Sequence, residues 1–566
     1  MPTVYINQQA VEVGADERLN CIQAAQRAGI EIPHYCWHPA LTVVASCRMC
    51  LVEIGEKKAD GTVSWQPKLF PGCQTPVREG MVIATDSEKV RQAQRATLEF
   101  LLLNHPLDCP VCDQAGECYL QDYSYRYGRG YSRLNEPKNI KPDKDYIGDQ
   151  ITLFTDRCIM CTRCVRFTRE ISGTAELQVI HRGTHEEIDI FPGEPCNNKL
   201  AGNVVDLCPV GALCSKDFLY RQRVWWLKTT ASVCPDCSTG CSINIDQNED
   251  TLYRLRPRFN PHVQGHFMCD DGRFGWKYIH SPSRLTQPLL RTAAGQLEPA
   301  DWDRVYAQIR TQFQTLGTKY PGSLAAVVSP WSTLEEAYLL TTWLRQLDPQ
   351  ARFYLGPVRI EGEDDHYPKT LPGQPREVKF TIRAEKAPNR RGIQFVLHQV
   401  GGSADYAQFL CDWQAGIIRG VYYLNADPHW RPEALPVAPS TTAPWLVLHD
   451  LLSSPLVEQA QVVLAGSAWA EKEGSFVNHS GWVQALRRAL RAPGDARADG
   501  RILWELTGRR GLFQAATLRR ELSAWIPACH NLSVGNLPEY GVSLVTPSVV
   551  AETETAGEAV PSPAHL

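Results

Sequence analysis

Fifteen cysteines and one histidine form four groups whose spacing suits metal binding. Of the 20 cysteines in the 566-residue chain, 18 lie within residues 1–269. Cysteine-dense disulfide scaffolds are typical of short exported chains. Here the first residues show neither a basic stretch followed by an apolar one nor an Arg-rich transit pattern, so we expect no export signal. In a reducing compartment, dense cysteines usually bind metal, and the pattern therefore predicts metal centres in the first half of the chain.

Set 1 consists of Cys36, Cys47, Cys50 and Cys73. A CxxC pair with one cysteine before it and a distant fourth resembles the plant-type [2Fe-2S] pattern, in which three thiolates of one loop and a remote thiolate bind the cluster. The inner spacing differs from the plant-type CxxxxCxxC. A zinc site with four cysteine ligands is the alternative, because thiolates suit both metals.

Set 2 consists of His105, Cys109, Cys112 and Cys118, in the run HPLDCPVCDQAGEC. A lone histidine more often packs in a core or caps a helix, but this one stands at the end of a predicted helix, just before a CxxC pair. We interpret it as a ligand of a [4Fe-4S] cluster. Because neutral imidazole carries less negative charge than thiolate, such a cluster should have a higher reduction potential than an all-cysteine one.

Set 3 consists of Cys158, Cys161, Cys164 and Cys208. A CxxCxxC run and a cysteine followed by proline are parts of the two-cluster bacterial ferredoxin motif. The first run does not continue to a fourth cysteine, since position 168 is Thr168. The three positions that would complete the second motif hold Asn198, Ala201 and Val204. A single [4Fe-4S] cluster is therefore predicted.

Set 4 consists of Cys234, Cys237, Cys241 and Cys269. This spacing alone also fits a zinc ribbon. Its continuation over residues 268–291, MCDDGRFGWKYIHSPSRLTQPLLR, is similar to the opening of molybdopterin oxidoreductases such as formate dehydrogenase, which implies a [4Fe-4S] cluster. The five remaining cysteines, to which we assign structural roles, are Cys21, Cys196, Cys214, Cys411 and Cys529.

In this order the four sets resemble the large iron–sulfur subunit of respiratory complex I, NADH:quinone oxidoreductase (the G subunit in bacteria, the 75 kDa subunit in mitochondria). The stretches that carry the resemblance are PHYCWHPAL, SCRMCLVEIG, LLLNHPLDCPVCDQAGECYLQDYSYRYG, DRCIMCTRCVRFTREISGT, GNVVDLCPVGAL, FTIRAEKAPNRRGIQ and AWAEKEGSFVNHSGWVQ. They extend over nearly the whole chain. The spacing of set 1 also matches the variant found in this family and in related hydrogenase diaphorases.

The resemblance implies a multidomain α+β and α/β fold. The expected domains are a [2Fe-2S] ferredoxin-like β-grasp domain (1–87), a histidine-ligated [4Fe-4S] segment (88–134), a bacterial-ferredoxin-like [4Fe-4S] domain (135–226), a molybdopterin-oxidoreductase-type [4Fe-4S] domain (227–285), a degenerate molybdopterin-oxidoreductase-like domain (286–550) and a disordered tail (551–566).

The last large domain is expected to hold no molybdopterin. Formate dehydrogenases carry a lysine two residues after the last cysteine of the fourth set, where this chain has Asp271. Their molybdenum ligand should follow well before residue 410, but no cysteine lies between Cys269 and Cys411. A catalytic metal without its thiolate is not expected, so the domain is interpreted as a scaffold.

The resemblance implies an electron relay in the peripheral arm of a proton-pumping complex, on the cytoplasmic side of the bacterial inner membrane. Electrons would enter set 1 from the FMN- and NADH-binding subunit, pass to set 3 and then set 2, and leave to a ferredoxin-like two-cluster subunit; set 4 would lie off this path. The small [2Fe-2S] partner of the FMN subunit and the quinone-site subunits are the other expected partners. Membrane contact is expected only through the complex, since no apolar run approaches about 18 residues.

No NADH, FMN or quinone site is expected in the chain itself, and no catalytic residue. It contains no P-loop, no GxGxxG between a strand and a helix and no GxSxG elbow. A net charge of −4 gives no case for nucleic-acid binding, and the Tyr- and Arg-rich stretch 119–133 is better explained by a subunit interface. The alternatives are an iron–sulfur component of an NAD-linked formate dehydrogenase or hydrogenase, and a zinc-stabilised scaffold.

Helices and strands that would position these sets follow from the hydrophobic pattern. Residues 2–14 predict a hairpin, and Asp16 is a candidate N-cap for a helix over 17–28 that Gly29 ends. A second helix is predicted over 88–104, stopped by Pro106. Residues 135–149 predict an exposed connection. In the second half we expect α/β structure with buried strands at 324–328, 420–424 and 445–448 and a helix at 334–347.

Overall fold

A computed structural model of the protein describes residues 2–370, 374, 376–402, 404–436 and 444–544, so the predicted tail 551–566 lies outside the described residues. The chain forms two compact units. Unit 1 contains the residues up to Leu227 together with the segment 367–379, and unit 2 contains the residues from Lys228 to His366 and from Phe380 onward. Each unit is described by itself.

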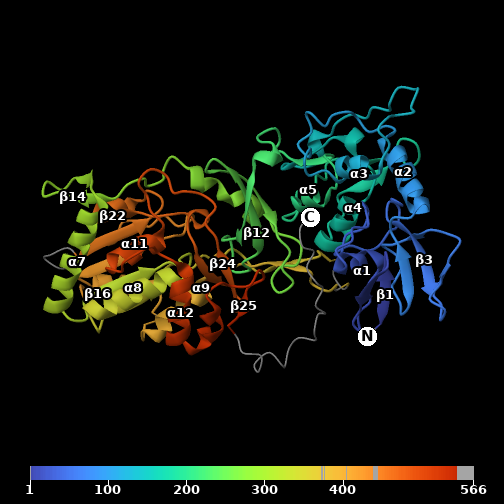
Figure 1. The fold of residues 1–566 in the computed structure, drawn as a ribbon. Helices are drawn as coiled ribbons and strands as arrows, with labels where there is room; N and C mark the ends of the chain where they lie inside the picture. Colours follow the sequence, from blue (N-terminus) through green and yellow to red (C-terminus); the bar gives the residue numbers. More distant parts are fainter. Residues whose placement is uncertain (1, 371–373, 375, 403, 437–443, 545–566) are drawn as a thin grey trace. The chain divides into compact units, whose positions relative to one another are not determined.

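Unit 1 begins with a mixed sheet in the strand order β2-β1-β6-β3-β4, with β5 paired to β3 (Figure 1). Strand β1 pairs parallel with β6, and the other pairs are antiparallel. The strands are β1 (Thr3–Ile6), β2 (Gln9–Glu12), β3 (Leu51–Lys57), β4 (Val63–Trp65), β5 (Phe70–Pro71) and β6 (Met81–Ala84). Alternate residues such as Val4 and Ile6 are fully buried and pack with Ile22 of helix α1 (Cys21–Arg27). The hairpin predicted at 2–14 is confirmed.

The N-cap of helix α1 lies four residues after the predicted one. Asn20, not Asp16, caps it: the Asn20 side chain accepts from the Gln23 amide, and the Asn20 amide donates to the Gln23 side chain at 3.0 Å. This capping box satisfies two backbone donors at once. Glu17, predicted inside the helix, instead pairs with Arg27 at 2.5 Å. Gly29 follows the helix in the left-handed region (φ +69°), as predicted.

Two longer helices follow in unit 1. Helix α2 (Glu88–Leu102) is capped by the Ser87 side chain and buries Val90 and Leu98, which confirms the predicted helix apart from its last two residues. Helix α3 (Tyr119–Tyr127) starts directly after a cysteine of set 2. The remaining elements of this unit are β7 (Ile151–Leu153), α4 (Arg163–Phe167), β8 (Gln178–Ile180), β9 (Glu187–Asp189), α5 (Asn203–Leu207) and β10 (Leu213–Ser215), with β7 paired to β10 and β8 to β9.

The connection 135–149 is only partly exposed. Lys144 is 3% exposed, and its ammonium group donates to Asp189 at 2.6 Å. The expectation of an exposed linker is therefore wrong at this residue, because the ion pair fastens the linker to β9.

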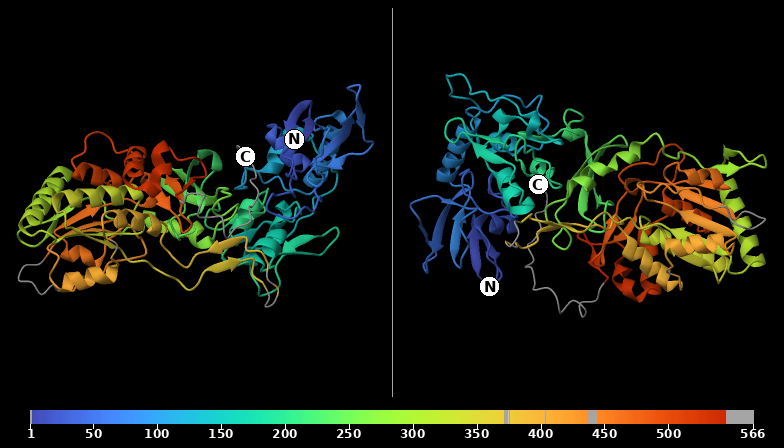
Figure 2. Two further views of the ribbon diagram at one scale, coloured as in Figure 1. Left: turned by 90° about the horizontal axis from the view of Figure 1, so that it is seen from below. Right: turned by 180° about the vertical axis from the view of Figure 1, so that it is seen from behind.

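One segment of the second half belongs to unit 1. It is the segment 367–379, which connects strands β18 (Asp365–Tyr367) and β19 (Phe380–Ile382). These two strands pair as a two-stranded ribbon, golden in Figure 2. At its tip the Lys369 amide donates to the Ser172 carbonyl at 2.8 Å. A Cβ atom on Gly173 would lie 2.3 Å from the Lys369 carbonyl oxygen, so glycine is required for this close approach.

Unit 2 opens with the antiparallel sheet β11 (Lys228–Val233), β12 (Ser242–Asn248) and β13 (Thr251–Pro257), followed by helix α6 (Asp270–Phe274). A seven-stranded sheet comes next, in the order β15-β14-β22-β21-β20-β16-β17. Its strands are β14 (Leu289–Arg291), β15 (Leu297–Pro299), β16 (Leu324–Val328), β17 (Arg352–Leu355), β20 (Gly420–Leu424), β21 (Trp445–Asp450) and β22 (Val462–Ala465). The five from β22 to β17 are parallel.

Helices cover both faces of this sheet, as expected for a parallel α/β sheet. Leu324 and Val328 face the core shared with helices α7 (Trp302–Lys319) and α8 (Leu334–Leu347), which Figure 1 shows beside the sheet. Ala325 and Val327 face a second core with helix α10 (Tyr406–Gln414). The predicted strands and helix in this region are confirmed. The unit is completed by α9 (Arg390–Gln399), α11 (Asp499–Leu506), α12 (Ala515–Trp525) and the small sheet β23 (Gly474–Val477), β24 (Trp482–Leu486), β25 (Val542–Ser543).

No helix among the described residues combines the length and apolar composition that crossing a membrane requires.

Candidate metal centres

The four thiols of set 1 lie together beside the N-terminal sheet. Cys36, Cys47 and Cys50 belong to the loop between α1 and β3, and Cys73 follows β5. Hydrogen bonds from Cys47 and Cys73 to its sulfur hold the pKa of Cys36 well below the usual value. The loop is folded tightly around the sulfurs, with Arg48 in the left-handed region (φ +59°). All four residues predicted for set 1 are therefore neighbours, three of them about 1% exposed.

Set 2 is assembled from the loop between α2 and α3. The Nδ1 atom of His105 is buried and has no hydrogen-bond partner among the described residues. Burial lowers the pKa of His105 to about 4, so the imidazole is neutral at pH 7 and its free nitrogen can bind a metal. Cys112 and Cys118 are buried, whereas Cys109 is exposed. A buried imidazole nitrogen without a hydrogen-bond partner, followed in the same loop by three cysteines, supplies the donor types that a histidine-ligated cluster needs.

Residues 209–223 contact the loop of set 2. Gly211 packs directly against the Sγ atom of Cys112. The Arg223 guanidinium donates to the Cys112 carbonyl at 2.8 Å. The Tyr119 amide, next to Cys118, donates to the Pro209 carbonyl at 3.1 Å.

Set 3 lines a small cavity together with Ile159, Ile188 and Leu213. Met160 and Thr162, which lie between the cysteines of the CxxCxxC run, adopt left-handed conformations (φ +51° and +59°). Burial raises the pKa of Cys158 to about 12 and of Cys161 to about 11. A positive metal centre would compensate the buried thiolate charge. The donor set and the cavity therefore fit an iron–sulfur cluster.

Set 4 lies in unit 2, between the sheet β11-β12-β13 and helix α6. The Cys234 amide donates to the Cys241 carbonyl at 2.8 Å. Cys269 is the N-cap of α6, and its sulfur accepts from the Gly272 amide at 3.5 Å. A Cβ atom on Gly272 would lie 2.6 Å from the Cys234 sulfur. All four cysteines are buried, and none forms a disulfide bond.

A lysine not singled out by the sequence analysis stands next to set 4. Lys386 is 6% exposed, and its ammonium group lies 3.4 Å from Asp236 and 3.7 Å from Asp271. Asp271 occupies the position at which formate dehydrogenases have lysine. Lys386, in the stretch FTIRAEKAPNRRGIQ, therefore places a positive charge next to Asp271 from a different part of the chain.

The five cysteines to which we assigned structural roles differ in burial and hydrogen bonding. Cys21 is fully buried in α1 within the first core, and its thiol donates to the Thr75 carbonyl at 3.4 Å. Cys214 donates to the Gly211 carbonyl at 3.6 Å. Cys196 and Cys529 are buried and Cys411 is exposed.

The basic residues of stretch 119–133 mostly bind within the chain. Arg126 pairs with Glu31 at 2.6 Å, and Arg133 pairs with Glu99 at 2.5 Å. Tyr125 and Tyr131 are 87% and 66% exposed. In this stretch it is therefore mainly the exposed tyrosines that could contact a partner protein.

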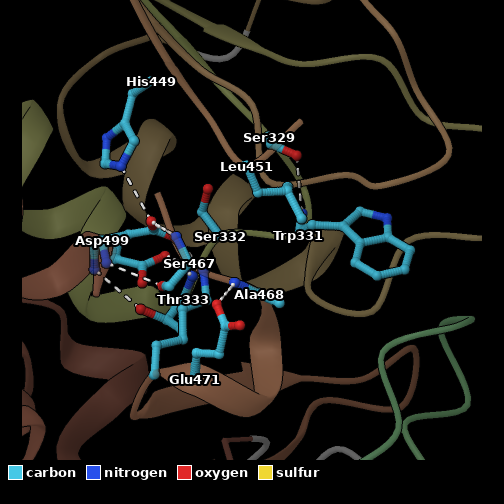
Figure 3. Close-up of polar contacts among 12 residues, drawn as sticks. Ser329, Trp331, Ser332, Thr333, His449, Leu451, Ser467, Ala468, Glu471 and Asp499 are labelled. Atoms are coloured by element: carbon cyan, nitrogen blue, oxygen red, sulfur yellow. Dashed lines mark hydrogen bonds and ion pairs between the residues drawn. The ribbon is translucent and has the colours of Figure 1, made fainter. Parts of the chain in front are cut away.

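The carboxyl edge of the seven-stranded sheet is the usual ligand site of an open α/β fold, at the point where the strand order reverses. Here that point lies between β16 and β20. The edge is filled by the protein's own polar groups: Lys472 donates to Asp499 at 2.7 Å and to Glu336 at 3.0 Å, and all three residues are buried. Figure 3 shows His449 and Ser467 directed toward Asp499, while Ala468 faces Glu471.

A small pocket remains beside set 4, lined by aromatic residues that include Trp276, Tyr278 and Trp331. Its volume is about 10 Å³, room for about one water molecule. This is far below the roughly 300 Å³ at which small-molecule sites begin.

Models of five protein families match the chain. They are described as 2Fe-2S iron-sulfur cluster binding domain (1–88), NADH-ubiquinone oxidoreductase-G iron-sulfur binding region (94–133), NADH-quinone oxidoreductase subunit 3, ferredoxin-like domain (148–214), Molybdopterin oxidoreductase Fe4S4 domain (227–281) and Molybdopterin oxidoreductase (284–354 and 413–509). Together with the four thiol sets, they define the class: an iron–sulfur oxidoreductase subunit of mixed α and β structure with 2Fe-2S and 4Fe-4S domains.

Three curated relatives illustrate which proteins the chain is similar to. The NADH-quinone oxidoreductase G subunit of Rickettsia conorii is 39% identical over 347 residues, which cover 61% of this chain and 49% of that protein. The G subunit of Streptomyces coelicolor is 30% identical over 93% of this chain and 63% of that protein. The NADH-ubiquinone oxidoreductase 78 kDa subunit of Neurospora crassa is 43% identical over 52% of this chain and 38% of that protein. The chain is a homologue of the NADH-quinone oxidoreductase G subunit.

The chain spans about half the length of the first curated relatives it matches. Among solved structures, an NAD+-reducing [NiFe]-hydrogenase in the H2-reduced state matches 39% of this chain and 91% of that chain, with 26% identity and a TM-score of 0.33.

Proposed function

We propose that the chain is the electron-relay subunit of a NADH:quinone oxidoreductase and holds four clusters. The single observation that carries this proposal is the gathering of predicted cysteine ligands, clearest in set 3, where all four cysteines line one cavity. Set 1 would bind a [2Fe-2S] cluster, and sets 2, 3 and 4 would each bind a [4Fe-4S] cluster. When bound, such clusters take up and release single electrons.

The contacts of set 3 support its place between sets 1 and 2. Arg157, beside Cys158, donates to Asp108, beside Cys109, at 2.8 Å. Arg166, on the helix that contains Cys164, donates to the Cys161 carbonyl at 3.3 Å and to the Cys36 carbonyl. The loops that hold set 3 are thus fastened to those of both other sets, as a middle position requires.

The surface around set 2 supports an electron exit toward a partner. Cys109 is exposed, and the flanking residues Leu107 and Val111 are 87% and 55% exposed. Exposed apolar side chains around a ligand allow a second protein to approach closely and exclude water. We assign this surface to the ferredoxin-like two-cluster subunit.

The other proposed partners are the FMN- and NADH-binding subunit, its small [2Fe-2S] partner and the quinone-site subunits. Through them the chain would lie on the cytoplasmic side of the inner membrane, peripheral to it.

The proposed domains keep the boundaries 1–87, 88–134, 135–226, 227–285 and 286–550, the first of them a β-grasp domain. The order of its sheet strands and the packing of α1 on that sheet support this assignment. We propose that the last domain is a scaffold without molybdopterin. The buried Lys472, Asp499 and Glu336 network at its carboxyl edge supports this, since these side chains satisfy one another.

A cysteine exchange in the assembled complex tests the proposed function. Cys161→Ser removes one ligand of set 3 and is expected to abolish NADH-to-quinone electron transfer, while NADH still reduces ferricyanide at the FMN subunit. Cys411→Ser, at an exposed cysteine outside the sets, is the matched control and should keep both activities. Full quinone reduction in Cys161→Ser complexes that lack the EPR signal of one [4Fe-4S] cluster would overturn the proposal.

A further inference from the structure

Two arginines of helix α4 are buried between the ligand loops of sets 1 and 3. Arg163 and Arg166 flank Cys164 and are 5% and 8% exposed. Arginine is almost never buried to this extent unless its charge is paired. Both belong to unit 1, as do all the residues around them.

Each guanidinium joins the backbone of one set to that of the other. Arg166 donates through Nη1 to the Thr42 carbonyl at 2.6 Å, and through Nη2 to the carbonyls of Cys36 and Cys161. Arg163 donates to the Trp37 carbonyl at 2.6 Å and to the Leu207 carbonyl at 3.3 Å. Trp37 follows a ligand of set 1, and Leu207 precedes a ligand of set 3.

Neither arginine is neutralised by a carboxylate. Over the described ranges of the chain, no Asp or Glu oxygen lies within 4.0 Å of either guanidinium. The nearby Glu170 is occupied by Thr42, whose hydroxyl and amide both donate to its carboxylate, at 2.5 and 2.9 Å. Two permanent cations therefore lie in a low-dielectric region with only uncharged oxygens as hydrogen-bond partners, the carbonyls and, for Arg166, the Thr162 hydroxyl at 3.4 Å. Such burial is costly unless negative charge is close.

Besides Glu170, whose charge acts on Arg166 without an ion pair, the negative charge near these arginines would be that of the thiolate-bound clusters. We propose that Arg163 and Arg166 are the shared counter-ions of the clusters in sets 1 and 3 and raise the reduction potentials of both together. Taking up one electron makes a cluster more negative by one charge, and a nearby buried cation stabilises the reduced form. Because one pair of cations acts on both clusters, the two potentials would rise together and the difference between them would change little. The inference rests on the proposed function, since it requires clusters in both sets.

Two variants and one control test the inference in the full chain, purified anaerobically in its complex. Arg166→Met and Arg163→Met each remove one buried cation and keep an unbranched side chain. Arg169→Met removes the same charge from the same segment, three residues after Arg166, but at an exposed position. Iron content and EPR-monitored redox titration are measured for each protein.

The expected result is a downward shift of two midpoint potentials at once, that of the [2Fe-2S] cluster and that of one [4Fe-4S] cluster, in Arg166→Met and in Arg163→Met. Arg169→Met should leave every midpoint unchanged. A variant that retains its iron but shows unchanged midpoints, or a shift of only one, would overturn the inference. Loss of iron from both variants would also overturn it, because the arginines would then be purely structural. A wild-type protein without iron would instead refute the proposed function itself.

Discussion

A Cβ atom built on Gly211 would lie 2.1 Å from the Sγ atom of Cys112. Gly211 follows the last ligand of set 3 by three residues, and Cys112 belongs to set 2, so one glycine fixes how closely the two ligand loops approach. No side chain, not even that of alanine, fits this position unless the sulfur moves.

Gly211→Ala is therefore expected to displace Cys112 and to remove the cluster of set 2 while the other three remain. The measurement is the iron content of the purified protein, with EPR to identify the missing signal. Gly130→Ala is the matched control, because nothing lies within 4 Å of a Cβ atom at Gly130 and its φ is not left-handed. Retention of all four clusters in Gly211→Ala would show that Cys112 is not a ligand.

His105→Cys replaces a neutral imidazole by a thiolate. The added negative charge disfavours reduction, so the midpoint potential of one [4Fe-4S] cluster is expected to fall. A redox titration followed by EPR detects the shift, with the wild-type protein as reference. If all midpoints stayed in place, His105 would not be a ligand.

Lys472→Met leaves the carboxylates of Glu336 and Asp499 buried without their cation. Breaking a buried ion pair on one side typically costs about 3–5 kcal/mol, so the thermal unfolding transition of the full chain should shift to lower temperature. Lys319→Met, at an exposed position of the same unit, should leave it in place. Equal transitions in the two variants would mean that the network contributes nothing to stability.

Asp450 predicts a pH dependence of stability. Burial raises the pKa of Asp450 from 3.8 to about 7, so the folded chain keeps a proton that the unfolded chain releases between these values. The contribution of this group to the free energy of unfolding is therefore present at low pH and is lost as the pH rises from about 4 to about 7, by at most about 1.4 kcal/mol per pH unit.

Asp450→Asn cannot release a proton and should flatten the stability profile over this range. Denaturant unfolding at several pH values measures the slope, with Asp303→Asn, at an exposed position, as the control. A wild-type slope in Asp450→Asn would contradict a raised pKa at this residue.

The sequence was sufficient to predict those strands and helices whose formation depends on neighbouring residues. The apolar run 324–328 and the helix 334–347 are found as predicted, because the run is buried on both faces and Thr333 and Glu336 form a capping box. The start of α1 was misplaced, since Asp16 and Asn20 are both good caps and only the reciprocal bond with Gln23 decides between them.

Interactions between distant residues could not be predicted in this way. Arg166 and the Cys36 carbonyl are 130 residues apart, and Lys386 and Asp236 are 150 apart. The sequence indicated the ligands because their spacing is local, whereas the charges around them come from the way the loops pack. Lys386 lies in the stretch FTIRAEKAPNRRGIQ, which resembles the family. The residues next to it in the sequence give no indication that it lies beside set 4.

The most direct test of the account is the metal content of the protein. One two-iron and three four-iron clusters predict about 14 irons per chain. Anaerobic purification followed by analysis of iron, sulfide, zinc and molybdenum, together with EPR of the reduced protein, gives this number and the cluster types. The expected result is iron and sulfide in that amount, with one [2Fe-2S] and three [4Fe-4S] signals and neither zinc nor molybdenum. Zinc in place of iron, or stoichiometric molybdenum, would contradict it.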